Sequence, residues 1–317
     1  MNVKRIVTSL FTIAGIFTAG AAGAQQWPSK PVTIVFGTAA GGPIDLMSRI
    51  IASQWEKKFA QKVIVENRPG ASSTLAGGVV ARAPGDGYTL LNGAFPPVGL
   101  FIKELPYDPF KDLTPVTVVA KQAYYLLVSS KMNIRTLKDF IAYARANPGK
   151  VSVGMVPSGP HEIESNRMLE VLGIQGNLIG YRGLATVYPA LMSGELNATL
   201  GATPPQLKTG EIVGLATGGS RRNPNFPDMP TFQEGGVQYE PSAIFPMFAP
   251  GTTPPALVSR ISAEVAAAVN SEEFAERITK TFSIDPSGVT PEVASRIIRD
   301  EYETSRRIAQ QVGIKPQ

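Results

Sequence analysis

The hydrophobic pattern of this chain combines short apolar runs with longer stretches of helical periodicity. Residues 31–36 are β-branched and apolar, which is typical of a buried strand. Residues 37–42 carry no bulky side chain, and apolar residues then recur at helical spacing from Ile44 to Ile51. The pattern predicts a strand, a loop of small residues and a helix that ends near Phe59.

The same unit recurs further along the chain. A strand over 63–67, a small-residue turn over 68–74 and a helix over 75–83 follow the first unit, and a strand over 151–155 opens another. Alternation of strands and helices predicts parallel sheets, in which ligands bind beyond the carboxyl ends of the strands. Further strands are expected at 88–91, 116–120, 124–129, 178–181, 197–200, 212–216 and 243–248, and further helices at 136–146, 162–172, 183–192, 257–270, 271–282 and 291–311.

The loop over 37–42 is a candidate anion site. The first turn of the following helix has backbone N–H groups without partners inside the helix, and the helix dipole favours negative charge there. Small residues allow a ligand to approach the backbone. A second helix start follows Ser72–Thr74, which are good capping residues. A tight turn without a ligand is the alternative, and these residues alone leave both interpretations open.

The first 24 residues resemble a secretory signal peptide. Lys4 and Arg5 precede the mostly apolar stretch 6–16, and Ala22-Gly23-Ala24 fits a small-residue cleavage site. The alternative is a membrane anchor, but Thr, Ser and Gly interrupt the apolar run. We therefore expect cleavage after residue 24 and a bacterial periplasmic location.

Charge and residue counts exclude several classes of site. Without Lys4 and Arg5, 28 basic residues face 25 acidic ones, and the net charge of +3 comes with no basic run that would grip nucleic acid. The chain has no cysteine, so it has neither disulfides nor a thiolate metal site. His161 is its one histidine, which argues against a multi-histidine zinc site. We expect no metal and no cofactor.

The chain resembles the Bug-type extracytoplasmic solute receptors, the substrate-binding proteins of tripartite tricarboxylate transporters. Each shared motif is short, but their order runs through the whole mature chain. The motifs are Trp27-Pro-Ser-Lys-Pro31, Gly41-Gly-Pro-Ile-Asp45 with Arg49, Val65-Glu-Asn-Arg-Pro-Gly-Ala71, Asp86-Gly-Tyr-Thr-Leu-Leu91, Tyr107-Asp108-Pro109, Asp112-Leu-Thr-Pro-Val116, Asn147-Pro-Gly-Lys150, Ser158-Gly159 with His161, Tyr181-Arg-Gly183, Leu191-Met-Ser-Gly-Glu195, Pro230-Thr-Phe-Gln-Glu-Gly235 and Ala249-Pro-Gly-Thr252.

The resemblance implies a type II periplasmic binding protein, with two α/β lobes, a cleft between them and a hinge of two chain crossings. The expected divisions are a signal peptide at 1–24, a first lobe of 25–122 plus 246–317, and a second lobe of 123–245. The resemblance also implies a monomer that binds a small organic acid through backbone N–H groups and hydroxyls and delivers it to membrane transporter subunits.

The resemblance and the helix starts together select candidate ligand-binding residues in both lobes. They are Thr38, Ala39, Ala40, Gly41, Gly42, Asp45, Ser72 and Ser73 in the first lobe, and Ser158, Gly159, His161, Tyr181, Ala185 and Thr203 in the second. The sequence departs from the family pattern at several of them. Pro43 and Ile44 replace the usual Gly and Thr, and Thr38 to Ala40 replace Phe and two prolines. Because these changes remove an N–H group and a hydroxyl, they predict an altered pocket.

Several assignments leave alternatives. Asp45 either orients the binding loop or only stabilises the first helical turn by its charge. His161 either donates to a bound anion or is a structural turn residue. A periplasmic sensor subunit acting on a signalling receptor would have the same fold and pocket. A hydrolase built on Ser158 and His161 is disfavoured, because the chain has no Gly-x-Ser-x-Gly elbow and this spacing does not make a triad.

Overall fold

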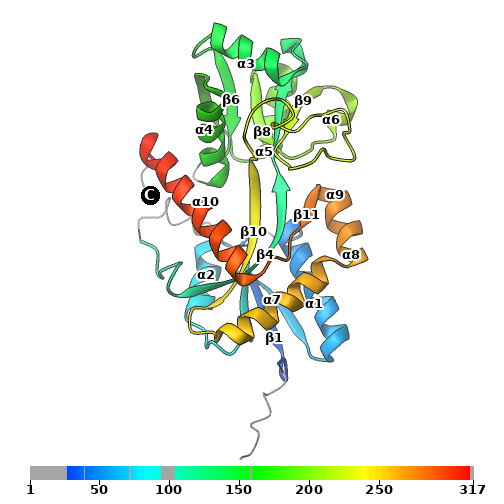
Figure 1. The fold of residues 1–317 in the computed structure, drawn as a ribbon, viewed down its shortest axis with the longest axis vertical. Coiled ribbons are helices and arrows are strands. Elements are labelled where there is room, and N and C mark those ends of the chain that lie inside the picture. The colour runs from blue at the N-terminus through cyan, green and yellow to red at the C-terminus, as the bar shows by residue number, and fades with distance from the viewer. Residues whose placement is uncertain (1–26, 39, 71–72, 94–103, 158, 315–317) are drawn as a thin grey trace, which may run out of the picture.

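The computed structural model describes residues 27–38, 40–70, 73–93, 104–157 and 159–314. The predicted signal peptide and the candidate residues Ala39, Ser72 and Ser158 lie outside the described residues. Two α/β lobes lie end to end, each built on its own sheet (Figure 1). Within the described residues, no helix has the length and apolar character needed to cross a membrane.

Lobe 1 contains a six-stranded sheet in the order β11-β4-β10-β3-β1-β2, in which β1, β2 and β3 are parallel. The strands are β1 (Val32–Phe36), β2 (Val63–Asn67), β3 (Thr89–Asn92), β4 (Leu113–Ala123), β10 (Ser242–Pro250) and β11 (Ile284–Pro286). The helices are α1 (Pro43–Phe59), α2 (Thr74–Ala81), α7 (Pro255–Val269), α8 (Glu272–Phe274), the π-helical turn η4 (Ala275–Thr279), α9 (Lys280–Phe282) and α10 (Pro291–Gln311).

Helices cover both faces of this sheet. Ile34 and Phe36 of β1 pack with α1 and α7 in one core cluster, whereas Val35 packs on the other face with α2 and α10. A strand buried on both faces has apolar residues at successive positions rather than in alternation. This explains the unbroken apolar run that predicted β1.

Lobe 2 contains a five-stranded sheet in the order β7-β6-β8-β5-β9. The strands are β5 (Tyr125–Ser129), β6 (Val151–Met155), β7 (Gly176–Gly180), β8 (Ala198–Gly201) and β9 (Ile212–Thr217), and the helices are η3 (Ser130–Met132), α3 (Leu137–Ala146), α4 (Pro160–Leu172), α5 (Leu184–Ser193) and α6 (Gln206–Thr209). Leu126 and Val128 of β5 face α3 and α4, and Leu127 faces α5.

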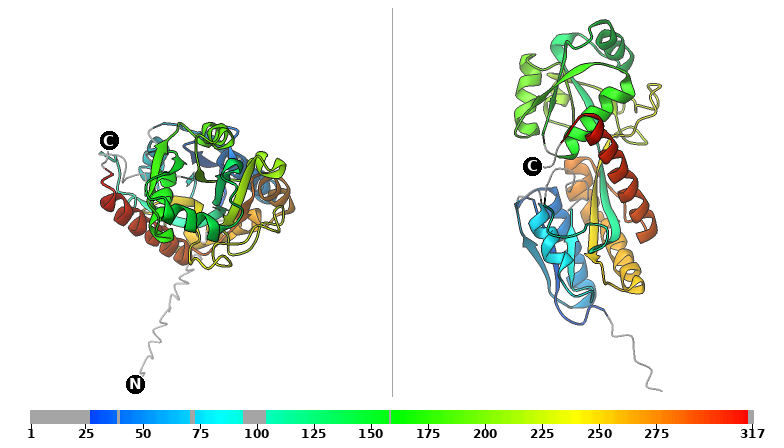
Figure 2. Two further views of the ribbon diagram at one scale, coloured as in Figure 1. Left: turned by 90° about the horizontal axis from the view of Figure 1, so that it is seen from above. Right: turned by 90° about the vertical axis from the view of Figure 1, so that its left-hand side faces the viewer.

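The chain passes between the sheets twice, where β4 leads into β5 and where the chain returns to β10. The first residues of β10 pair with the last residues of β4, Ser242 with Ala123 and Ala243 with Gln122. Helix α10 spans the same junction, because its first half packs on β4 and its second half on α4 (Figures 1 and 2). Arg307 of α10 forms an ion pair with Glu170 of α4, with 2.9 Å between Nη1 and Oε1.

The helix expected over 271–282 is present from Glu272 to Phe282, where α8, η4 and α9 follow one another directly, and its middle turn is π-helical rather than α-helical. The short strand β11, which follows α9, pairs antiparallel with β4 and was not anticipated. A strand of three residues has too little periodicity to be recognised from sequence.

Candidate functional site

The carboxyl ends of the parallel strands in the two sheets face one another across the hinge. In lobe 2, Gly201 at the end of β8 pairs with Tyr125, one residue after the crossing point. In lobe 1, Asn92 at the end of β3 pairs with Met247, in an antiparallel ladder whose partner strand arrives from lobe 2. The loops after β1, β2, β6 and β7 therefore lie at the facing ends of the lobes.

The loop between β1 and α1 is held in a defined shape by Asp45. The Gly41 backbone N–H donates to Oδ2 of Asp45 at 2.8 Å, and Arg49 Nε lies 2.7 Å from Oδ1. The Asp45 side chain is buried, whereas Gly41 is exposed and has a φ of +81°. The acid therefore orients the loop as well as contributing charge to the first turn, which combines the two roles predicted for it.

The start of α1 has no side-chain cap. Gly42 is its N-cap in extended conformation, and Pro43 occupies the first helical position. Because the first N–H groups of a helix have no partners inside the helix, the amides of Ile44 and Asp45 remain to be satisfied by another group. Thr38 and Ala40 lie in the same loop, and Ala40 is exposed.

The loops after β1 and β2 touch each other. A Cβ atom built on Gly37 would lie 2.4 Å from Ser73 Cβ, so only glycine allows this approach. The Asn67 amide also donates to the Thr38 carbonyl. Two loops far apart in sequence thus form one surface.

Ser73 has a left-handed backbone, with a φ of 72°, at the N-cap of α2. The other described non-glycine residues with positive φ, Ala60, Asn133 and Ser283, each follow the last residue of a helix, where this conformation is common. At a helix start the same conformation is unusual, and such strain concentrates at functional sites. The Ser73 side chain does not cap its own helix, and its contact with a ligand stays a prediction.

Across the hinge, α4 begins with Gly159 as an extended N-cap and Pro160 at its first position, again without a side-chain cap. His161 follows, but both of its ring nitrogens are engaged within lobe 2. Nδ1 accepts from the Val156 N–H at 3.0 Å, and Nε2 lies 2.8 Å from the Leu200 carbonyl oxygen. These partners require a neutral ring with the proton on Nε2, and burial lowers the pKa of His161 in the same direction.

His161 therefore acts as a structural residue that joins the turn after β6 to the end of β8. Its ring also packs edge-on against Tyr124 at the crossing point, with ring centroids 5.8 Å apart. Neither nitrogen is left to donate to a solute. Its direct contact with a ligand stays a prediction, and the structure favours the structural alternative.

The remaining candidates of lobe 2 lie around the start of α5 and the end of β8. Ala185 is exposed in the first turn of α5, whose N-cap is Gly183. The Tyr181 hydroxyl donates to Oε1 of Glu195 at 3.1 Å, so its phenol is turned toward the far end of α5. The Thr203 hydroxyl lies 3.3 Å from the Ser283 hydroxyl of lobe 1 and is a direct contact between the lobes.

Asn92 is a site-shaping residue that sequence reasoning missed. It is fully buried at the end of β3, and its amide donates to Ser48 Oγ at 2.8 Å, which in turn donates to the Ile44 carbonyl. This chain of bonds fixes the start of α1 against β3. Its position in the sequence was a usable signal. Asn92 directly follows the third predicted strand, 88–91, and each of the first two predicted strands is followed by a candidate loop.

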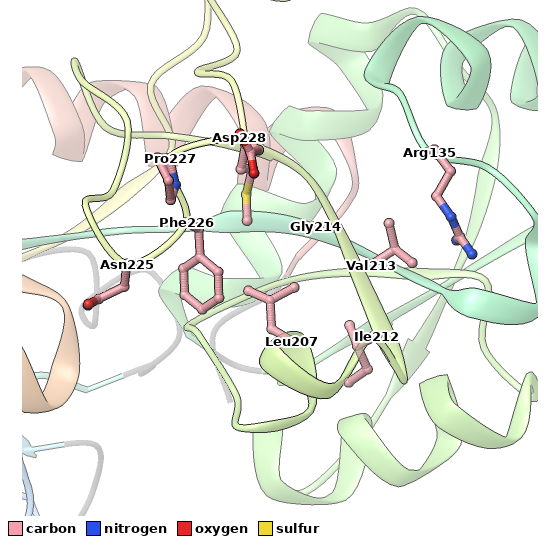
Figure 3. A pocket seen from close by; sticks show the side chains of 11 residues that line it. Arg135, Leu207, Ile212, Val213, Gly214, Asn225, Phe226, Pro227 and Asp228 are labelled. Atoms are coloured by element: carbon pink, nitrogen blue, oxygen red, sulfur yellow. The ribbon is translucent and has the colours of Figure 1, made fainter.

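Two cavities lie elsewhere in the molecule. One, of about 380 Å³, lies between the lobes and is lined by Ala123, Tyr125 and residues of the loop after β9 from lobe 2, and by Thr279, Lys280, Ser283 and Asp285 from lobe 1. The other, of about 510 Å³, lies within lobe 2 between β9, the end of α6 and residues 225–229 (Figure 3). None of the candidate site residues that the structure describes lines either cavity.

The facing loops form a set of donors suited to an anion. Four helices, α1, α2, α4 and α5, begin there, and in the described part of the chain their N-cap residues provide no side-chain cap, as is also the case for α7 and α10. Uncapped helix starts bind carboxylates and phosphates through backbone N–H groups. In the part of the chain that is described, no group of three or more acidic or histidine side chains could hold a metal ion.

Comparisons with known proteins identify the family and the fold of this chain. A sequence profile of the tripartite tricarboxylate transporter family receptor matches residues 47–314. The protein BugT of Bordetella pertussis is 28% identical over 323 residues, which cover 98% of this chain and 99% of BugT.

Two solved structures are similar along their whole length. The Rhodopseudomonas palustris protein Rpa4515, solved with adipate, has a TM-score of 0.73 and 29% identity, covering 92% of this chain and 100% of that one. MatC from the same organism, solved with bound malate, has a TM-score of 0.69 and 26% identity, covering 89% and 99%. The predicted fold class, a two-lobed α/β periplasmic binding protein, is confirmed by these structures and by the two observed sheets.

Proposed function

The chain belongs to the family of tripartite tricarboxylate transporter receptors, and from this premise we propose that it captures a small organic acid between its two lobes in the periplasm and delivers it to the membrane subunits of such a transporter. Members of this family are solute-binding receptors and not enzymes. The proposal includes removal of residues 1–24 on export and action as a monomer.

One observation carries the proposal most directly. Helices α1 and α2 of lobe 1 and α4 and α5 of lobe 2 begin at the facing ends of the sheets, and among the described residues their N-cap side chains make no capping hydrogen bond. A carboxylate placed between them would accept hydrogen bonds from backbone N–H groups of both lobes. The charged ligand then favours closure of the lobes, because each lobe alone supplies only part of the N–H groups that bind the carboxylate.

We infer that the acid is a dicarboxylate of four to six carbons. Adipate and malate, the ligands in the two similar structures, are both dicarboxylates of this size. Two pairs of opposed helix starts are suited to two carboxylate ends. Lobe 1, residues 25–122 plus 246–317, and lobe 2, residues 123–245, then act as the two bodies that close on it.

A thermal-shift titration of the chain from Gln25 onward tests this function. Malate and adipate are compared with malamide and adipamide, which keep the shape and lose the charge. An acid present at about 100 times its dissociation constant should add about 2.7 kcal/mol of stability. A shift with an acid and none with its amide supports the proposal. A shift with an amide alone, or none with any of the four compounds, contradicts it.

A further inference from the structure

The cavity between the lobes contains a second arrangement of anion-binding groups, separate from the helix starts. Its volume is about 380 Å³, and none of the eleven candidate site residues that the structure describes lines it. Ser283 connects the cavity to these candidates, because it lines the cavity and lies 3.3 Å from the Thr203 hydroxyl. It lies on the α9 side of the hinge, between the loop after β9 and the segment from η4 to β11.

The charged residues around the cavity are mostly basic. Arg221 and Arg222 come from lobe 2 and Lys280 from lobe 1, and Asp285 is the one acidic side chain among the lining residues. Two guanidinium groups and an ammonium give several donors for oxyanions, and guanidinium groups match carboxylate and phosphate geometry. Among the lining residues the basic side chains outnumber the acidic one by two, while Glu234 and Glu276, the partners of Arg222 and Lys280, are not among the lining residues. The cavity is large enough for a small organic acid or phosphate.

Each of these cations has a carboxylate partner on the exposed surface. Arg222 Nε donates to both carboxylate oxygens of Glu234, at 3.1 and 2.9 Å, and Arg221 lies 3.4 Å from Asp285, with side chains that are 75% and 51% exposed. Lys280 pairs with Glu276 of the preceding turn, again with both side chains more than half exposed. Exposed ion pairs contribute little to stability. An anion entering the cavity can take over these cations without disrupting the fold.

The lobe 1 wall of the cavity has two features that a simple surface would not need. The segment Ala275–Thr279 is a π-helical turn, a rare conformation that is frequent at functional sites. Thr279 closes this turn and lines the cavity, and its hydroxyl is buried without a hydrogen-bond partner in the described part of the chain. A buried hydroxyl without a partner is costly, so an anion that reached it after a small movement of this wall would gain a hydrogen bond.

We propose that this cavity binds a small polyvalent anion, a polycarboxylate or a phosphate compound, held by Arg221 and Arg222 of lobe 2 and by Lys280 and Thr279 of lobe 1. Because its ligands come from both lobes, the anion binds this arrangement of the lobes more tightly than one in which they are apart. It therefore biases the receptor toward the closed arrangement, independently of the solute at the helix starts.

The test is isothermal titration calorimetry of the mature chain at low ionic strength, where screening is weakest. Pyrophosphate and tricarballylate are the two probes, so that the result separates the phosphate from the carboxylate source. Arg221→Gln and Lys280→Gln each remove one charge from one wall. Lys208→Gln is the matched control, because Lys208 is an exposed lysine of α6 that does not line the cavity.

We expect at least one probe to bind, and each cavity variant to weaken it by about tenfold or more while Lys208→Gln leaves it unchanged. Absence of binding by both probes overturns the proposal, as does an equal loss in the control. A second variant set separates this site from the helix starts. If Gly41→Leu abolishes binding of a probe and the cavity variants do not, the probe occupies the proposed solute site and the cavity has no such role.

Discussion

Glu301 is a carboxyl group in an unfavourable position between the lobes. It lies on α10, which packs against α4, and it faces Glu164 and Arg167 of α4 with Tyr124 and Tyr239 nearby. Burial raises the pKa of Glu301 from 4.5 to about 7, the negative charge of Glu164 adds to this rise, and Arg167 partly offsets it. The ionised carboxylate therefore opposes the packing of α10 on lobe 2.

The sign and size of this effect follow from linkage. The folded chain holds the Glu301 proton up to about pH 7 and the unfolded chain releases it near 4.5, so stability falls between these values as the pH rises. Each tenfold change in proton affinity is worth about 1.4 kcal/mol. At pH 8 the ionised Glu301 therefore lowers the free energy of unfolding by about 1–3 kcal/mol, and the lower end of this range allows for solvent screening. Glu301→Gln should recover this amount.

The assay is thermal unfolding of the parent and of Glu301→Gln at pH 8 and pH 5. We expect the variant to unfold about 2–6 °C higher at pH 8, and most of the gain to disappear at pH 5, where the parent carboxyl is protonated in the fold. Glu303→Gln, an exposed glutamate on the same helix, is the control and should change little at either pH. An equal gain at both pH values, or a loss at pH 8, would refute the reasoning.

Three further results are expected. His161→Ala should lower the free energy of unfolding in urea by about 2–4 kcal/mol at pH 8, because it leaves the Val156 N–H and the Leu200 carbonyl without partners. Burial lowers the pKa of His161 in the fold, so below pH 6.5 the parent is destabilised by protonation of this histidine in the unfolded chain. The difference between parent and variant should therefore shrink below pH 6.5. Asp45→Ala should weaken acid binding by about tenfold in calorimetry, because the Gly41 loop loses its anchor, and unchanged affinity would contradict this role. Thr203→Ala should leave stability within about 0.5 kcal/mol but alter the lobe arrangement seen by small-angle scattering, and an unchanged profile would show that its contact with lobe 1 has no influence.

Much of the fold was predictable, because it rests on short-range patterns. The apolar run of β1, the small-residue loop and the helical spacing after it predicted the first unit, and the end of α1 at Phe59 was also correct. The helix over 271–282 was predicted as well, but its π-helical middle turn was not, because such a turn has no periodicity of its own in sequence. The loops at strand ends were identified because topology alone places them there.

Residue roles were less predictable, because they depend on contacts between distant segments. The bonds of His161 to Val156 and Leu200 combine one local partner with one from a strand 39 residues away. The close approach of Gly37 to Ser73 likewise appears only when β1 and β2 are paired. The interlobe cations Arg221 and Lys280 belong to no sequence motif, and only the folded chain brings them to one cavity.

The central claim is that the loop before α1 seats the carboxylate of the solute, and one pair of variants tests it most directly. Gly41→Leu and Gly149→Leu place the same side chain at positive φ, +81° and +72°, and at either position a Cβ atom has no atom of the described residues within 4 Å beyond its own chain neighbours. The backbone strain is therefore matched, but Gly149 lies in the turn before β6, at the end of lobe 2 away from the facing loops. The measurement is the affinity of each variant for the acid found in the thermal-shift titration. The account predicts that Gly41→Leu loses binding while Gly149→Leu keeps that of the parent, and equal affinities in the two variants would contradict it.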